Sequence, residues 1–331
     1  MKVILDSNVW RYVADHDDGN ELANRSADFG IEIVVAPALV FEARALKDDT
    51  MRKKILELIC LPSWRRLMPE AFLEAEEIKN IVRRLRPEWV ISHPDLSEVN
   101  RLRLDWERTD GGFWSNARDD IAPAETDESL RGDQEHALAI QESKNIRQRV
   151  LGRNQTLPIL SLVHMYGVPP VNIPGWRGEP VEYWRVPSLY HIQNELSIYT
   201  SPYREWLDSE LDVAAIAAEP ESLTRLWYYE IAPVEARRQW IRGGYEFLQA
   251  FHKVTSGNPA DSQLSSHLVD VDAIVSADRN FVRFAQKCFD DSPFPLAQPY
   301  LISGGANAVG DLFALLRDLR TAIPQSRRSI S

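Results

Sequence analysis

Two carboxylates of the sequence follow closely on predicted strands. Asp6 comes directly after the apolar residues 3–5, and Asp278 comes shortly after the apolar segment 273–276. Continuous apolar runs rich in Val and Ile are typical of strands that are covered on both faces. Because a buried and unpaired charge is costly, such a strand should not end in an acid that only faces the core. We therefore expect both acids to belong to a site.

Two further acids are expected near the same place. Glu42 lies in the helix predicted to follow the second strand, and Asp261 lies at the start of the helix predicted to precede the strand that leads to Asp278. Sites of parallel α/β sheets lie beyond the carboxyl ends of the strands, so these acids and Asp6 should converge on one edge. Asp272 precedes its strand and is expected at the opposite edge.

Four carboxylates at one edge would repel one another and raise one another's pKa values. Divalent cations remove this repulsion, and Mg²⁺ and Mn²⁺ prefer oxygen ligands while they keep several waters. A metal held in this way lowers the pKa of an attacking water and stabilises the leaving oxygen of a phosphodiester. The acidic set therefore predicts a Mg²⁺ or Mn²⁺ site for phosphodiester hydrolysis.

The elements that must position these acids come from the two ends of the chain. Strands are predicted within 3–5, 31–37, 273–276 and 299–305, and helices within 37–49, 258–269 and 310–323. Strands that alternate with helices predict an α/β fold with a parallel sheet. Between the ends, helices are predicted at 69–86, 131–149 and 188–211, separated by loops rich in Pro, Gly and Trp. We predict a core from residues 1–61 and 222–331 and a mainly helical insertion over 62–221.

Composition limits the class of protein. The 331 residues are 44% apolar and include ten tryptophans, which allows a sizeable core. An apolar run of about 18 residues is missing, and no basic and then apolar leader is seen, so neither a membrane span nor a signal peptide is expected. Cys60 and Cys288 have no metal spacing, which fits a reducing cytoplasm. The net charge of −11 argues against a nucleic-acid binder, although bound cations would reverse the field of an acidic site.

Four segments resemble the signature segments of PIN-domain nucleases, a family that includes the toxin ribonucleases of bacterial toxin–antitoxin pairs. They are VILDSNVW, APALVFEARA, NPADSQLSSHLV and IVSADRNF. The resemblance implies a parallel sheet flanked by helices that cuts single-stranded RNA with Mg²⁺ or Mn²⁺. Carried over by position, it implies catalytic and metal-binding roles for Asp6, Glu42, Asp261 and Asp278, and supporting roles for Ser7, Asn8 and Ser276.

The resemblance covers roughly residues 1–60 and 240–302. The long gap between Glu42 and Asp261 departs from the small toxins, and the segment DSQLSSHL is more polar than the apolar run usual there. Each acid also has an interpretation without catalysis. Asp6 could cap a helix, Asp261 could be a first-turn acid, and Asp278 could be a turn residue. Glu42 alone would be an ordinary helix residue, and it is a candidate because the four acidic segments occur in the same order as in the family.

A candidate RNA contact lies in the segment 225–248, which mixes arginines with aromatic residues. Its members are Arg237, Arg238, Trp240 and Arg242. Arginines release counterions when they neutralise phosphates, and aromatic rings can stack on bases. The other tryptophans are expected to be packing anchors, and the histidines show no metal spacing such as HExxH.

Three functions stay open on the sequence alone. The first is a metal-dependent endoribonuclease, as a toxin or a defence effector. The second is a haloacid-dehalogenase-like phosphatase, which should carry an acid where this chain has Asn8. The third is a non-catalytic binding module with a PIN fold. For the first, RNA is the expected substrate, no membrane is involved, and an antitoxin, another regulatory protein or a second copy of the chain are the open partners.

Overall fold

This computed structural model describes residues 1–108, 110–121, 161–199, 201–249 and 258–322. Within these ranges a five-stranded parallel sheet has the order β3-β2-β1-β6-β7, which confirms the predicted α/β class. Its strands are β1 (Lys2–Leu5), β2 (Glu32–Val35), β3 (Arg65–Arg66), β6 (Ala273–Ser276) and β7 (Gln298–Leu301).

Strand β1 is the centre of the sheet. Ile4 is the register partner of Val34 in β2 and of Ile274 in β6. All three side chains are fully buried, because helices cover both faces of the sheet. The ladder continues past the strand, since the backbone N–H of Asp6 donates to the carbonyl of Val275 at 2.9 Å. The first acid therefore lies beside the carboxyl end of β6.

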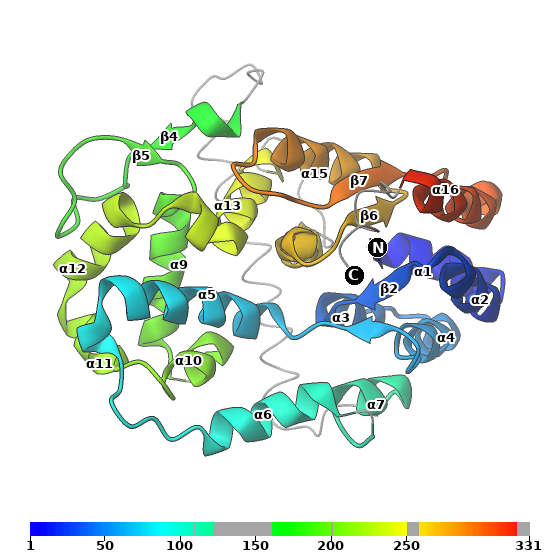
Figure 1. Ribbon diagram of the computed structural model, residues 1–331, viewed down its shortest axis with the longest axis horizontal. Helices are drawn as coiled ribbons and strands as arrows, with labels where there is room; N and C mark the ends of the chain where they lie inside the picture. Colours follow the sequence, from blue (N-terminus) through cyan, green and yellow to red (C-terminus); the bar gives the residue numbers. More distant parts are fainter. Residues whose placement is uncertain (109, 122–160, 200, 250–257, 323–331) are drawn as a thin grey trace, which may run out of the picture.

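Seven helices of the described ranges lie around the sheet. They are α1 (Ser7–Asp15), α2 (Gly19–Phe29), α3 (Pro37–Arg44), α4 (Asp49–Ile59), α14 (Asn258–Ser265), α15 (Arg279–Asp291) and α16 (Ala308–Ala322). Among them, α3, α14 and α16 lie close to the helices predicted at 37–49, 258–269 and 310–323. Helix α14 runs directly into the 3₁₀ turn η5 (Ser266–Val269), and η6 (Gly305–Asn307) precedes α16. In Figure 1, α1, α2 and α16 lie together at the right of the sheet.

The middle of the chain is mainly helical, and most of it forms the left half of Figure 1. Its helices are α5 (Glu70–Leu85), α6 (Ser97–Glu107), α7 (Phe113–Arg118), α9 (Arg185–Ser197), α10 (Pro202–Leu207), α11 (Val213–Ala218), α12 (Pro220–Arg225) and α13 (Arg237–Gln249). Short turns are η1 (Pro87–Trp89), η2 (Leu162–His164), η3 (Leu226–Glu230) and η4 (Pro233–Glu235), and β4 (Tyr166–Gly167) pairs antiparallel with β5 (Val181–Glu182). None of the helices in the described ranges has the length and apolar character needed to cross a membrane.

Two predictions about the middle of the chain need correction. The helix expected over 188–211 is two helices, because Pro202 cannot continue one and begins the next. Strand β3 falls inside the predicted insertion, so the sheet uses residues beyond the boundary at 62. The predicted helix 131–149 lies outside the described residues. The described apolar residues of the sheet and of the middle helices form one continuous core.

Candidate functional site

Asp6 is the buried centre of the candidate site. It is only 3% exposed and is the N-cap of α1, where its Oδ1 accepts from the backbone N–H of Ser7 at 2.7 Å. Its Oδ2 accepts from Asn8 Nδ2 and from Ser276 Oγ, both at 2.6 Å. Burial raises the pKa of Asp6, and these three hydrogen bonds oppose the rise without cancelling it. The side chain is thus both a helix cap and a held carboxylate.

Ser276 and Asn8 tie the ends of two neighbouring strands together. Asn8 Nδ2 also lies 3.2 Å from Ser276 Oγ, while its Oδ1 accepts from the backbone N–H of Ala277 at 2.9 Å. Ser276 Oγ in turn accepts from the backbone N–H of Asp278 at 2.9 Å. The supporting residues expected from the sequence therefore orient Asp6 through hydrogen bonds that come from the start of α1 and from the end of β6.

Asp278 begins the helix after β6. Its Oδ1 accepts from the backbone N–H groups of Asn280 at 2.6 Å and Phe281 at 3.2 Å, so it caps α15. The side chain is exposed, and its charge contributes to raising the pKa of Asp6. Like Asp6, Asp278 both caps a helix and contributes its charge to the group of acids.

Glu42 and Asp261 bring two further acids from α3 and α14, which contact each other. Burial, with repulsion from Asp6, raises the pKa of Glu42 to about 7, although a hydrogen bond with Ser7 opposes the rise. Burial raises the pKa of Asp261 to about 9, and the charges of Asp6, Glu42 and Asp278 add to it. The charges of the other three acids thus all act on Asp261, and we call Asp6, Glu42, Asp261 and Asp278 the acidic site.

The donor set of the acidic site suits a hard divalent cation. It offers only carboxylate oxygens, which Mg²⁺ and Mn²⁺ prefer, and their mutual repulsion is what such a cation relieves. In the part of the chain that the structure describes, no three His, Cys, Asp or Glu side chains are arranged so that they could hold a metal ion. The acids are coupled through their charges rather than through a formed coordination shell.

Asp272 lies at the opposite edge of the sheet. Its Oδ2 accepts from the backbone N–H of Lys2 at 2.7 Å, and its own N–H donates to the Lys2 carbonyl at 2.9 Å. Lys2 is the first residue of β1, so Asp272 marks the amino ends of the strands. The two acids that flank β6 therefore face different environments, as expected.

The candidate RNA contact is not available on the surface. Arg238 and Trp240 are only 5% exposed, and the side chain of Arg242 is 15% exposed and paired with a buried carboxylate. Arg237 is the exception, with 42% of its side chain exposed. The prediction of an exposed patch is therefore wrong for three of its four members. The local sequence shows arginines beside aromatic residues. It does not show that carboxylates of α5 pair with these arginines in the folded protein.

Tyr245 of α13 borders the acidic site, and it is not among the site residues predicted from the sequence. The side chain is fully buried, and its hydroxyl lies 3.3 Å from the carbonyl of Phe281. Burial raises the pKa of Tyr245 well above its ordinary value, and the charges of Asp261 and other nearby acids add to the effect. No pattern in the surrounding helix distinguishes this tyrosine from a packing residue.

Comparison with known proteins gives no family for this chain. The chemistry of the acidic site therefore has to be inferred from its own residues. No family model matches the sequence, and no match is found among the curated proteins or among the solved structures.

Proposed function

We propose that this protein is a Mg²⁺- or Mn²⁺-dependent ribonuclease that hydrolyses phosphodiester bonds at the acidic site. The carrying observation is that burial raises the pKa of Asp261 and that the charges of three acids, Asp6, Glu42 and Asp278, add to the rise. Asp6 and Asp278 follow the carboxyl ends of β1 and β6, the usual place for a site in such a sheet. Burial is the largest cause that raises the pKa values of Asp6, Glu42 and Asp261, and the charges of neighbouring acids add to it. The choice of RNA depends on the resemblance of four sequence segments to PIN-domain nucleases.

The residues of the acidic site divide the work between orientation and proton release. Asp6 is fixed by Ser276 and Asn8, so it would hold a cation with little loss of side-chain freedom. Glu42 has a pKa of about 7 in the metal-free protein, so it would release a proton near neutral pH when it becomes a carboxylate ligand. A bound divalent cation would lower the pKa of the attacking water and stabilise the leaving oxygen.

Asp261 allows the proposed metal binding to be tested without measuring RNA cleavage. Since its pKa is about 9, its carboxyl group is mostly protonated at neutral pH in the metal-free protein. A cation binds the carboxylate and not the acid, so metal binding should release protons. Calorimetric titration with Mn²⁺ in buffers of different ionisation enthalpy measures this release directly.

The identity and contacts of Asn8 argue against the phosphatase alternative. Such an enzyme would use an acid at this position, whereas here the amide donates to Asp6 and accepts from the Ala277 backbone. Both halves of the amide are therefore used to orient the site. A carboxylate at this position could not donate to Asp6, and it would add a further charge.

The test is cleavage of single-stranded RNA by wild type, Asp6→Asn and Asp272→Asn, with Mn²⁺ and with chelator. We expect Asp6→Asn to lower the rate by about a hundredfold or more, since it removes a ligand of the proposed metal. Its melting temperature should change little, because one charge leaves a repelling group. Asp272→Asn is the matched control at the opposite edge and should cut at the wild-type rate. Equal rates for wild type and Asp6→Asn, or cleavage that persists in chelator, would refute the proposal.

A further inference from the structure

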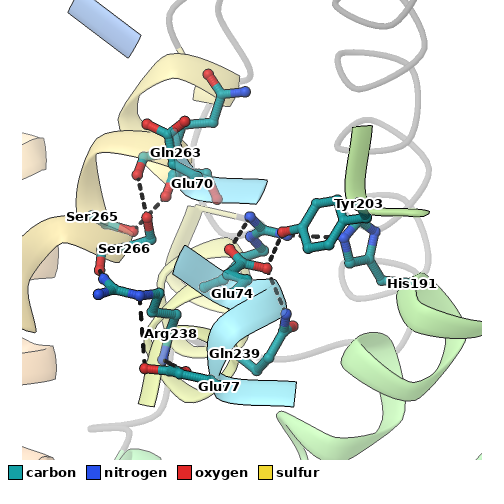
Figure 2. A network of polar contacts seen from close by, with 12 residues as sticks. Glu70, Glu74, Glu77, His191, Tyr203, Arg238, Gln239, Gln263, Ser265 and Ser266 are labelled. Atoms are coloured by element: carbon teal, nitrogen blue, oxygen red, sulfur yellow. Dashed lines mark hydrogen bonds and ion pairs between the residues drawn. The ribbon is translucent and has the colours of Figure 1, made fainter. Parts of the chain in front are cut away.

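A buried polar network lies behind the acidic site, and the chemistry proposed above does not use it. Glu70 and Glu77 come from α5, Arg238 comes from α13, and His267 and Asp270 come from η5 and the residue after it. We call these five residues the buried network. Figure 2 shows Arg238 extending between Ser266 of η5 and Glu77 of α5. The network thus joins three elements that are far apart in the sequence.

His267 is held between two acids. Its Nε2 lies 2.9 Å from Glu70 Oε1, and its Nδ1 lies 3.0 Å from Asp270 Oδ2. Ionised carboxylates only accept hydrogen bonds, so both ring nitrogens must donate and the ring is an imidazolium. Burial alone would lower the pKa of His267, but its hydrogen bonds with Asp270 and Glu70 outweigh burial and raise it. A neutral ring could satisfy only one of the two acids.

Arg238 fixes the same turn from the side of α13. Its Nη2 and Nη1 donate to the two oxygens of Asp270 at 2.8 and 2.9 Å, and Nη1 also donates to the carbonyl of Ser266 at 2.8 Å. The backbone N–H of Arg238 donates to Glu77 Oε2 at 3.1 Å. Bidentate charge-assisted pairs of this kind fix geometry as well as adding energy. The turn η5 is therefore held by α5 and α13 together.

The turn η5 is the direct continuation of the helix that carries Asp261. Ser265 is fully buried and its hydroxyl donates to the carbonyl of Ser262 at 2.7 Å, and Ser266 donates in the same way to Gln263 at 2.8 Å. These bonds join the end of α14 to η5 without a flexible segment between them (Figure 2). Asp261 lies about one turn before this junction. A shift of η5 would move its carboxylate with it.

We propose that His267 and Arg238 are positioning residues for Asp261, because they clamp the end of α14 against the middle helices of the chain. The inference rests on the proposed function, since it assigns Asp261 to the metal. Glu70 and Glu77 of α5 are then the outer supports of the acidic site. Neither positioning residue contacts the proposed metal or the RNA, so their effect has to pass through the placement of one ligand.

The test compares His267→Gln with Tyr203→Phe. Tyr203 donates to the fully buried Glu74, and Figure 2 shows this pair on the side of the polar contacts away from Ser265 and Ser266. Both changes remove a buried hydrogen bond, so both should lower the melting temperature. Only His267→Gln should raise the Kd for Mn²⁺, by about tenfold, as is typical for partners behind a metal ligand. It should also lower kcat for RNA with KM unchanged, and speed amide exchange within α14.

A second pair of variants uses the other end of the clamp. Glu70→Gln keeps an oxygen that accepts from His267 Nε2, whereas Glu70→Leu does not. We expect Glu70→Gln to retain most of the wild-type Mn²⁺ affinity and Glu70→Leu to lose it. The same comparison applies if His267→Gln does not fold.

Each outcome separates the two proposals. A folded His267→Gln protein with lower melting temperature but wild-type Mn²⁺ affinity and kcat overturns the positioning role and leaves the ribonuclease intact. A wild type that neither binds Mn²⁺ nor cuts RNA overturns the proposed function and the metal role of Asp261. In that case amide exchange in α14 alone decides whether His267 holds the helix, and an unchanged exchange rate refutes the clamp.

Discussion

Two groups of carboxylates in this protein, each with one acid that is almost fully buried, differ in what surrounds them. In the acidic site, Asp6 is held by hydroxyl, amide and backbone donors, while burial raises its pKa and the charge of Asp278 adds to the rise. Away from that site, Glu74 is fully buried beside the guanidinium of Arg242, and Asp270 pairs with Arg238. The chain thus neutralises one group with its own cations and leaves the other charged or protonated.

This difference separates carboxylates that maintain the fold from carboxylates that suit a ligand. An acid paired with arginine has its counter-charge built in, so it needs nothing from solution. An acid beside other acids is destabilising until a proton or a metal ion arrives. Substitutions in the two groups should change the unfolding free energy in opposite directions. Loss of a cation in the paired group should lower it, and loss of the Glu42 charge in the acidic site should raise it.

The largest effect on stability is expected in the paired group. Arg242→Leu leaves Glu74 fully buried without that guanidinium, while Tyr203 and Gln239 still donate to it and the charge of Arg238 still acts on it. Loss of one partner of a buried pair typically costs about 3–5 kcal/mol of unfolding free energy. Urea denaturation measures the loss. A double variant in which Leu also replaces Glu74 should recover part of it, and a single variant as stable as wild type would mean that Glu74 needs no cation.

The pH dependence of the metal-free protein tests the unpaired group. Because the folded pKa of Glu42 is raised to about 7, its protonated form stabilises the fold fully below its ordinary pKa. This stabilisation is lost as the pH rises through about 7, and a shift of this size corresponds to about 3 kcal/mol. Asp261 extends the decline towards pH 9.

The control for this decline is Glu42→Gln, measured in chelator across the same range. Glu77, outside the acidic site, also has a pKa of about 7, raised by burial, and it would add to the slope in both proteins. The difference between the two curves therefore isolates Glu42. Wild type should lose stability relative to the variant between pH 5 and 8, and Mn²⁺ should reverse the difference. Parallel curves would show that Glu42 does not sense the other acids.

The smallest effect separates the two roles of Asp278. Ser is a good N-cap, so Asp278→Ser should keep α15 capped and change stability by only a few tenths of a kcal/mol, while Asp278→Ala should cost about 1 kcal/mol. Both remove the carboxylate and should weaken Mn²⁺ binding alike, which calorimetry measures. If the serine variant binds Mn²⁺ as wild type does, Asp278 is a cap and not a ligand.

The sequence predicted the elements that carry strong patterns. The apolar runs of β1, β2 and β6 identify strands covered on both faces, and parallel strands place Asp6 and Asp278 at one edge. Strand β3 was missed because Arg65 and Arg66 have no apolar pattern, and backbone pairing alone makes them a strand. The residue pattern of a short segment predicts its local structure. It does not show which distant strand the segment will pair with.

The buried network was not predictable for the same reason. His267 and Glu70 are separated by 197 positions, and each residue alone is typical of a solvated helix surface. The arginines of α13 were interpreted as an RNA contact because their acidic partners, Glu74 and Asp270, lie on other elements. The partner of a charged residue can be identified only when the folded structure shows which distant residues lie beside it.

The pairing of β1 with β6 also fixes when the site can exist during synthesis. Asp6 is made 270 positions before Ser276, whose hydroxyl donates to it. Contacts between such distant positions form late, after the chain between them has been made. A nascent chain therefore carries Asp6 without its support until residue 276 has left the ribosome. A ribonuclease built in this way would remain inactive beside the RNA of its own ribosome while those residues are being translated.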